Sequence, residues 1–95
     1  MIKDIIKEAI EELNEQLDDD EKIEYDENLK LIGKNAALNS MSFVTFVTIV
    51  EELLEEKQDI SVEIVSDKAF SREHSPFYSI QTFEEFVEEL INEKE

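Results

Sequence analysis

The chain of 95 residues contains no cysteine and only one glycine, one proline and one histidine. Without cysteine it can form neither disulfides nor thiolate metal sites, so the redox compartment stays open. A single glycine excludes the glycine-rich loops that cradle phosphates. No apolar run approaches the ~18 residues of a membrane span, and the N-terminus enters a charged amphipathic pattern directly. We therefore expect a cytoplasmic protein without a secretion signal or a membrane segment.

Basic residues are also scarce, because nine Lys and Arg stand against 26 Asp and Glu, giving a net charge of −17. This charge repels nucleic acid and anionic membranes, and it favours encounters with basic patches on other proteins. A merely solvated surface explains the acidity equally well, so charge alone identifies no function. The length and the 41% hydrophobic content predict one small domain over residues 1–95.

Apolar residues recur at helical spacing in three segments, which predicts helices over about residues 2–17, 40–56 and from residue 82 towards the C-terminus. Thr82 and Glu85 have the spacing of a capping box for the last helix. The middle helix has a wide apolar surface that includes Phe43, Val44 and Phe46, so we expect it at the centre of a bundle. Ser66 and the four residues after it predict one turn of a short third helix.

The connection between the first two helices, residues 18–39, is long for a loop. Six apolar side chains are expected to pin it onto the bundle: Ile23, Tyr25, Leu29, Leu31, Ile32 and Leu38. Gly33 is expected where the backbone needs positive φ. The acidic cluster in residues 18–26 fails as a calcium loop, because its sixth position is Ile23 where that loop requires glycine.

Ile60, Val62 and Ile64 alternate with polar residues, as in a strand. Such a strand has no partner beyond the short segment 22–25, and two short strands make a weak sheet. We therefore expect an extended connection whose apolar side chains enter the bundle.

Catalytic residues are not evident in the sequence. The one histidine, His74, lies in a polar, irregular segment, and an exposed loop histidine explains it best. The carboxylates are many, but the sequence offers no way to select an acid–base pair among them. We therefore expect neither a stand-alone enzyme nor a metal site.

The most informative stretch is Leu31-Ile32-Gly33, followed by Ala36-x-Leu38-Asn39-Ser40-Met41 and a strongly periodic helix. Asn39 is a good N-cap, because its side-chain oxygen can accept a free N–H of the first turn. Ser40 then begins the helix with its hydroxyl in water, where an attached anion is favoured by the helix dipole and the free N–H groups.

This stretch, running into an apolar helix that ends in glutamates, resembles the acyl carrier protein family, whose members carry 4′-phosphopantetheine on the serine of an Asp-Ser-Leu or Asp-Ser-Met triplet. The resemblance implies an all-α four-helix bundle with three longer helices, a short third helix and a long first loop. It also implies that Ser40 is the attachment site, with Asn39 in place of the family's aspartate. The long segment 69–82 resembles, more weakly, stand-alone bacterial carriers of specialised clusters.

By the same resemblance, the partners are a phosphopantetheinyl transferase and loading ligases, synthases or transferases with basic docking patches, and the chain is a monomer. The docking face would be Met41, Thr45, Thr48, Glu51, Glu52 and Glu55. An attached acyl chain would lie near Phe43, Val44, Val47, Ile64 and Phe70.

Two other functions stay open. Asn39 removes a negative charge beside Ser40, which favours an unmodified acidic adaptor that keeps the carrier fold and docks on a basic partner. A small hydrolase that uses Ser40 or His74 is the third and weakest hypothesis.

Overall fold

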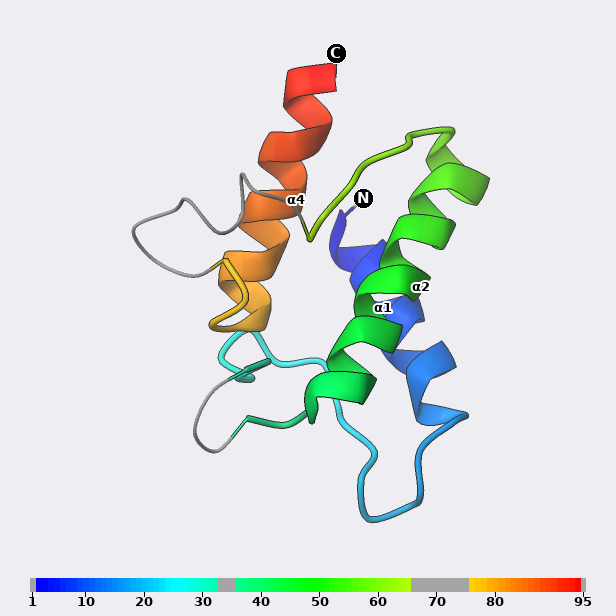
Figure 1. Ribbon diagram of the computed structural model, residues 1–95, viewed down its shortest axis with the longest axis vertical. Helices are drawn as coiled ribbons and strands as arrows, with labels where there is room; N and C mark the ends of the chain where they lie inside the picture. The colour runs from blue at the N-terminus through cyan, green and yellow to red at the C-terminus, as the bar shows by residue number, and fades with distance from the viewer. Residues whose placement is uncertain (1, 33–35, 66–75, 95) are drawn as a thin grey trace.

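The computed structural model describes residues 2–32, 36–65 and 76–94, which form three helices and no strand. The helices are α1 (Ile2–Asn14), α2 (Ser40–Gln58) and α4 (Ile80–Lys94). Figure 1 shows α1 and α2 lying against each other, with α4 beside them. The all-α prediction is confirmed for these residues. The predicted third helix and the predicted positive φ of Gly33 lie outside the described residues.

Helix α1 buries one apolar stripe: Ile2, Ile5, Ile6, Ala9, Ile10 and Leu13. It ends at Asn14, three residues before the predicted end at Leu17, and the chain continues in turns. The reason is the Asn14 side chain, whose Nδ2 donates to the Ile23 carbonyl at 2.8 Å and whose Oδ1 accepts from the Ile23 N–H at 2.9 Å. This pair of bonds closes the loop over residues 15–22 at the end of the helix.

Helix α2 begins as predicted, because the Asn39 Oδ1 accepts the Ser42 N–H at 2.8 Å. It runs to Gln58, two residues beyond the predicted end. Asp59 then adopts a left-handed conformation with φ 54°, which Asp tolerates better than most residues. The N–H groups of Asp59 and Ile60 both donate to the Leu54 carbonyl, and so satisfy a free acceptor at the helix end.

Of the three described helices, α1 is the one that packs against both others, whereas the sequence predicts α2 at the centre of the bundle. Helix α1 packs against both α2 and α4, whereas no Cα of α2 comes within 8 Å of a Cα of α4. The Val44 side chain, which belongs to the apolar surface predicted for this helix, is 59% exposed, and Met41 is 81% exposed. One side of the N-terminal half of α2 therefore faces water.

Aromatic rings bridge the space between α2 and α4. Phe77 lies just before α4, and its ring centroid is 5.1 Å from that of Phe43 on α2 and 6.2 Å from that of Phe83 on α4. Phe46 and Phe83 also meet directly, with centroids 5.4 Å apart. Phe46, Phe77 and Phe83 are buried, and Phe43 packs against them half-buried. Helices α2 and α4 are therefore joined by packed aromatic side chains, and their backbones do not come close to each other.

The N-terminus of α4 differs from the prediction. The helix begins at Ile80, and its capping box is formed by Ser79 and Thr82 instead of Thr82 and Glu85. The Ser79 N–H donates to Thr82 Oγ1 at 3.0 Å, and the Thr82 N–H donates to Ser79 Oγ at 3.3 Å. The N–H groups of the first two residues of α4 donate to the carbonyls of Leu29 and Glu27 in the first loop, each at 3.0 Å.

The first loop is pinned largely as predicted. Ile23, Leu31 and Leu38 are buried, and Tyr25 and Leu29 pack against the core half-buried. The exception is Ile32, which is 39% exposed, so its predicted inward position is wrong.

Tyr25 joins this loop to α1 and to α4. Its hydroxyl donates a hydrogen bond to a carboxylate oxygen of Glu84 on α4. The ammonium groups of Lys3 and Lys7 on α1 lie 5.9 and 5.2 Å from the centre of its ring, which is cation–π distance. The loop therefore connects α1 to α4 through one side chain.

The segment after α2 is extended, without a strand in the described residues, as predicted. Ile64 is fully buried, and Ile60 and Val62 pack against the core. The Glu51 Oε2 of α2 accepts the Ile64 N–H at 2.9 Å. This bond fastens the segment to α2 where its most buried side chain enters the core.

Candidate functional site

Ser40 is solvent-exposed at the first position of α2. Asn39 satisfies two of the first N–H groups, because its Oδ1 accepts from Ser42 and its carbonyl accepts from Phe43 at 2.9 Å. In the parts of the chain that the structure describes, the N–H groups of Ser40 and Met41 have no acceptor. These N–H groups bear the partial positive charge of the helix N-terminus, and they lie beside the Ser40 hydroxyl.

Helix α4 provides a contrast within the same molecule. Its first four N–H groups, those of residues 80–83, all have acceptors in Ser79 or in the first loop. An anion could therefore gain new hydrogen bonds at the start of α2 but not at the start of α4. The difference arises because carbonyls of the first loop, those of Glu27 and Leu29, accept N–H groups at the start of α4.

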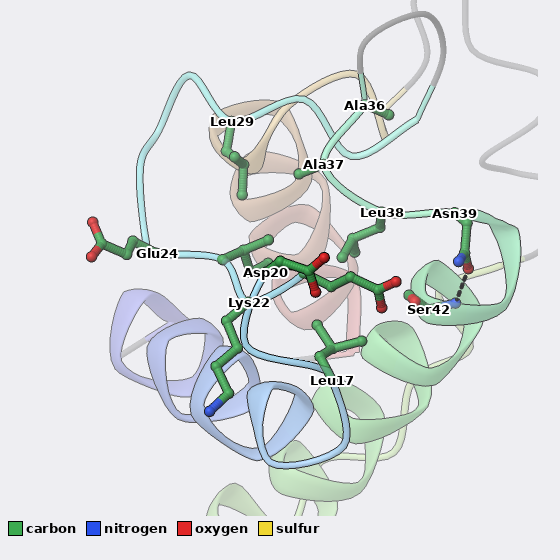
Figure 2. A pocket seen from close by; sticks show the side chains of 12 residues that line it. Leu17, Asp20, Lys22, Glu24, Leu29, Ala36, Ala37, Leu38, Asn39 and Ser42 are labelled. Carbon is green, nitrogen blue, oxygen red and sulfur yellow. Dashed lines mark hydrogen bonds between the residues drawn. The ribbon is translucent and has the colours of Figure 1, made fainter.

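An open groove of about 770 Å³ lies next to this helix start. Figure 2 shows that it runs between the turn after α1, residues 17–24, and the segment 36–42 that leads into α2. Its apolar lining is Leu17, Ile23, Leu29, Ala36, Ala37 and Leu38, and its charged lining is Asp20, Glu21, Lys22 and Glu24. Asn39 and Ser42 line its end beside Ser40. The sequence analysis did not predict this groove.

The residues predicted to form a docking face divide into two groups. Met41, Thr48, Glu52 and Glu55 are exposed, and Thr45 is half-buried. Glu51 is half-buried and is engaged by the Ile64 N–H. The hydroxyls of the two threonines donate to carbonyls of their own helix, Thr45 to Met41 and Thr48 to Val44, each at 3.0 Å. Their polar atoms are thus turned towards the backbone.

The residues predicted to surround an acyl chain also divide. Val47 and Ile64 are buried in the core and Phe43 packs against it, whereas Val44 faces water. Phe70 lies outside the described residues. None of the four described residues lines the groove beside Ser40.

The described residues contain no group of three Asp, Glu, His or Cys side chains that could hold a metal ion. His74 lies outside the described part. None of the three described helices is long and apolar enough to cross a membrane.

The Tyr25 phenol has a pKa well above its usual value. Burial contributes most, followed by the hydrogen bond to Glu84 and the negative charges of Glu84 and Glu27. The group is thus held protonated, as the donor to Glu84, which fits a structural role.

A scan against protein-family models finds no match, and comparisons with curated proteins and with solved structures find none either. The functional assignment therefore rests on the residues and the geometry of this chain.

Proposed function

We propose that the protein is a carrier that holds acyl or aminoacyl groups as thioesters on a 4′-phosphopantetheine arm attached to Ser40. The observation that supports this most is the exposed Ser40 hydroxyl at the start of a capped helix, beside two N–H groups that have no acceptor among the described residues. The Asn39-Ser40-Met41 triplet resembles the triplet of acyl carrier proteins, and this resemblance is the reason for proposing 4′-phosphopantetheine as the attached group.

The residues at the start of α2 fit a phosphodiester. On attachment, the Ser40 oxygen loses its proton and forms an O–P bond, the pyrophosphate bond of coenzyme A breaks, and the nucleotide part leaves. The product carries a phosphodiester anion at the N-terminus of α2. The helix dipole stabilises this anion by about 0.3–1 kcal/mol at an exposed site. The arm supplies a terminal thiol for the thioester, and the chain supplies the anchor and the docking surface.

The exposed side of α2 is suited to a basic partner such as a loading ligase, synthase or transferase. Met41 and Val44 offer exposed apolar surface next to Ser40. Glu52 and Glu55 lie further along the helix and are exposed. Such a surface pairs an apolar contact near the arm with charges that steer a positively charged groove.

A second function, an unmodified acidic adaptor that docks through the same side of α2, is favoured by Asn39. Asn39 keeps the cap bond to Ser42 but carries no charge beside Ser40. If the transferase uses a carboxylate at that position, modification would be slow or absent.

The test is the intact mass of the protein after incubation with coenzyme A, magnesium and a promiscuous phosphopantetheinyl transferase. We expect wild type to gain the mass of one phosphopantetheine and Ser40→Ala to gain nothing. Ser42→Ala is the matched control, because Ser42 offers a hydroxyl in the same turn of α2 and should leave modification intact. Wild type that never gains mass would count against the carrier function.

Asn39→Asp separates the two functions. Modification of wild type and of Asn39→Asp at similar rates supports the carrier. Modification of Asn39→Asp alone supports the adaptor, since the fold would then accept the arm only after the missing charge is restored.

A further inference from the structure

We infer that the groove beside Ser40 receives the loaded end of the arm and favours an aminoacyl group with a protonated amine over neutral or anionic acyl groups. This inference rests on the proposed carrier function and specifies the class of cargo. It is carried by three features of the groove: its place next to Ser40, its apolar lining, and the charges around it.

The groove is within reach of a flexible arm attached to Ser40. Asn39 and Ser42, on either side of that residue, line one end of the groove. The other end lies at the turn after α1, towards Glu24 (Figure 2). An arm attached to Ser40 can therefore enter the groove at the end lined by Asn39 and Ser42.

The apolar lining suits the methyl and methylene groups of the arm and of a short cargo. Leu17, Ile23 and Leu38 come from both sides of the groove, the first two from the turn after α1 and the third from the segment before α2. Ile23 and Leu38 are themselves nearly buried, so the lining is held by the core. This part of the groove does not distinguish a charged from a neutral cargo.

The charges make that distinction. Three carboxylates line the groove, those of Asp20, Glu21 and Glu24, and none has an ion-pair partner among the described residues. The single cation of the lining, Lys22, is paired with Asp19 at 3.0 Å.

Figure 2 shows how these side chains are directed. In Figure 2 the Lys22 ammonium and the Glu24 carboxylate point away from the groove, whereas the Asp20 side chain lies over its middle. The groove therefore attracts a cation and repels a carboxylated cargo. Because the carboxylates are exposed, we expect a modest preference, roughly twofold to fivefold in occupancy of the groove.

The experiment compares two cargoes of the same shape. The wild-type protein is loaded on Ser40 from β-alanyl-coenzyme A and, separately, from butyryl-coenzyme A, which carry an ammonium and a methyl group at the same position. Amide chemical shifts are recorded for each loaded protein and for the protein with the bare arm. We expect β-alanyl to shift the amides of Ile23 and Leu38 more than butyryl does, and the difference to shrink at high salt.

The variant Asp20→Asn with Glu21→Gln should bring the β-alanyl shifts down to the butyryl level. The matched control is Glu11→Gln with Glu12→Gln, which removes the same charge from the exposed face of α1, away from the groove. It should leave the shifts unchanged.

Two results would overturn the inference. Equal shifts from the two cargoes, or no shifts at residues of the groove, would show that a loaded arm does not select a cation there, while the mass gain would still support the carrier. Failure of Ser40 to load at all would remove the carrier function and this inference with it.

Discussion

Asn39 performs a structural task that any chemistry at Ser40 depends on. Its side chain accepts the Ser42 N–H, and its carbonyl accepts the Phe43 N–H. These bonds fix the first turn of α2, and among the described residues the N–H groups of Ser40 and Met41 are left without an acceptor. Asp in the same place would keep the acceptor and add a charge, so the cap and the charge can be separated by substitution.

Asn39→Ala should lower the free energy of unfolding by about 1 kcal/mol, because the cap acceptor is lost. Asn39→Asp should keep the stability of wild type or exceed it, since an anion at a helix N-terminus is favourable. Urea unfolding followed by circular dichroism measures both. Equal stability of Asn39→Ala and wild type would show that the cap contributes nothing.

The stability of the protein should fall above about pH 10, where an unperturbed tyrosine ionises. The pKa of Tyr25 is raised in the folded state, so its contribution is complete below the unfolded-state pKa and is lost as the pH rises through the folded-state pKa. Tyr25→Phe should flatten this dependence. Identical alkaline profiles of Tyr25→Phe and wild type would contradict this account.

At the scale of elements, signals between neighbours along the chain predict more of the structure than contacts between distant segments do. The periodicity of α1, α2 and α4 and the cap at Asn39 depend on neighbours along the chain, and the structure agrees with them. The predicted capping box of α4 was three residues too late. Ser79 and Thr82 have the same spacing and form the box, and the carbonyls of residues 27 and 29 in the first loop accept the next two N–H groups there.

Phe77 was missed for a related reason. It lies in a stretch that is mostly polar, residues 71–79, and its position between α2 and α4 follows only from the packing of helices that are distant in the chain. The wide apolar surface of α2 does not show which helices cover it: Val44 is exposed, and among the described helices only α1 packs directly on α2.

Glu51 was predicted as a docking residue, and the structure gives it a second task. Its carboxylate accepts the Ile64 N–H and so holds the segment after α2 in the core. Glu51→Ala should cost roughly 1–3 kcal/mol, because the Ile64 N–H loses its partner. Glu51→Gln keeps an acceptor and should cost less, and Glu52→Ala, at an exposed position, should cost little.

Amide hydrogen exchange provides the measurement for Glu51. In Glu51→Ala the Ile64 amide should exchange faster, with little change at the start of α2. Unchanged protection of Ile64 would mean that the hydrogen bond does not hold the segment.

At the scale of the whole molecule, the net charge of −17 opposes a compact state through self-repulsion. The Cα radius of gyration is 12.6 Å, close to the roughly 12 Å expected for a compact chain of this length. The negative charges are therefore close together on a small surface. The described core contains no buried polar or charged residue that could pair with them.

Raising the salt concentration from about 0.02 M to about 0.5 M NaCl should increase the urea midpoint, because the Debye length falls below the spacing of most surface charges. Glu55→Gln with Glu56→Gln, which removes two charges, should weaken this dependence. A midpoint that falls or stays constant with salt would show that self-repulsion is not a significant cost.

The candidate site was predictable from sequence only in part. Ser40 and Asn39 were identifiable because the triplet and the cap are local. The groove was not, since it forms between residues 17–24 and 36–42, and only the folded path of the first loop brings them together. Its acidic residues are visible in the sequence, but the sequence does not show that they line a groove next to Ser40.

The most direct test of the carrier function is the mass of the protein isolated from the cells that make it, with the modified residue located by fragmentation. The account predicts a chain heavier than its sequence by one phosphopantetheine or its thioester, with the added group on Ser40. A chain recovered only at the mass of its sequence would contradict the carrier function and leave the acidic adaptor as the better explanation.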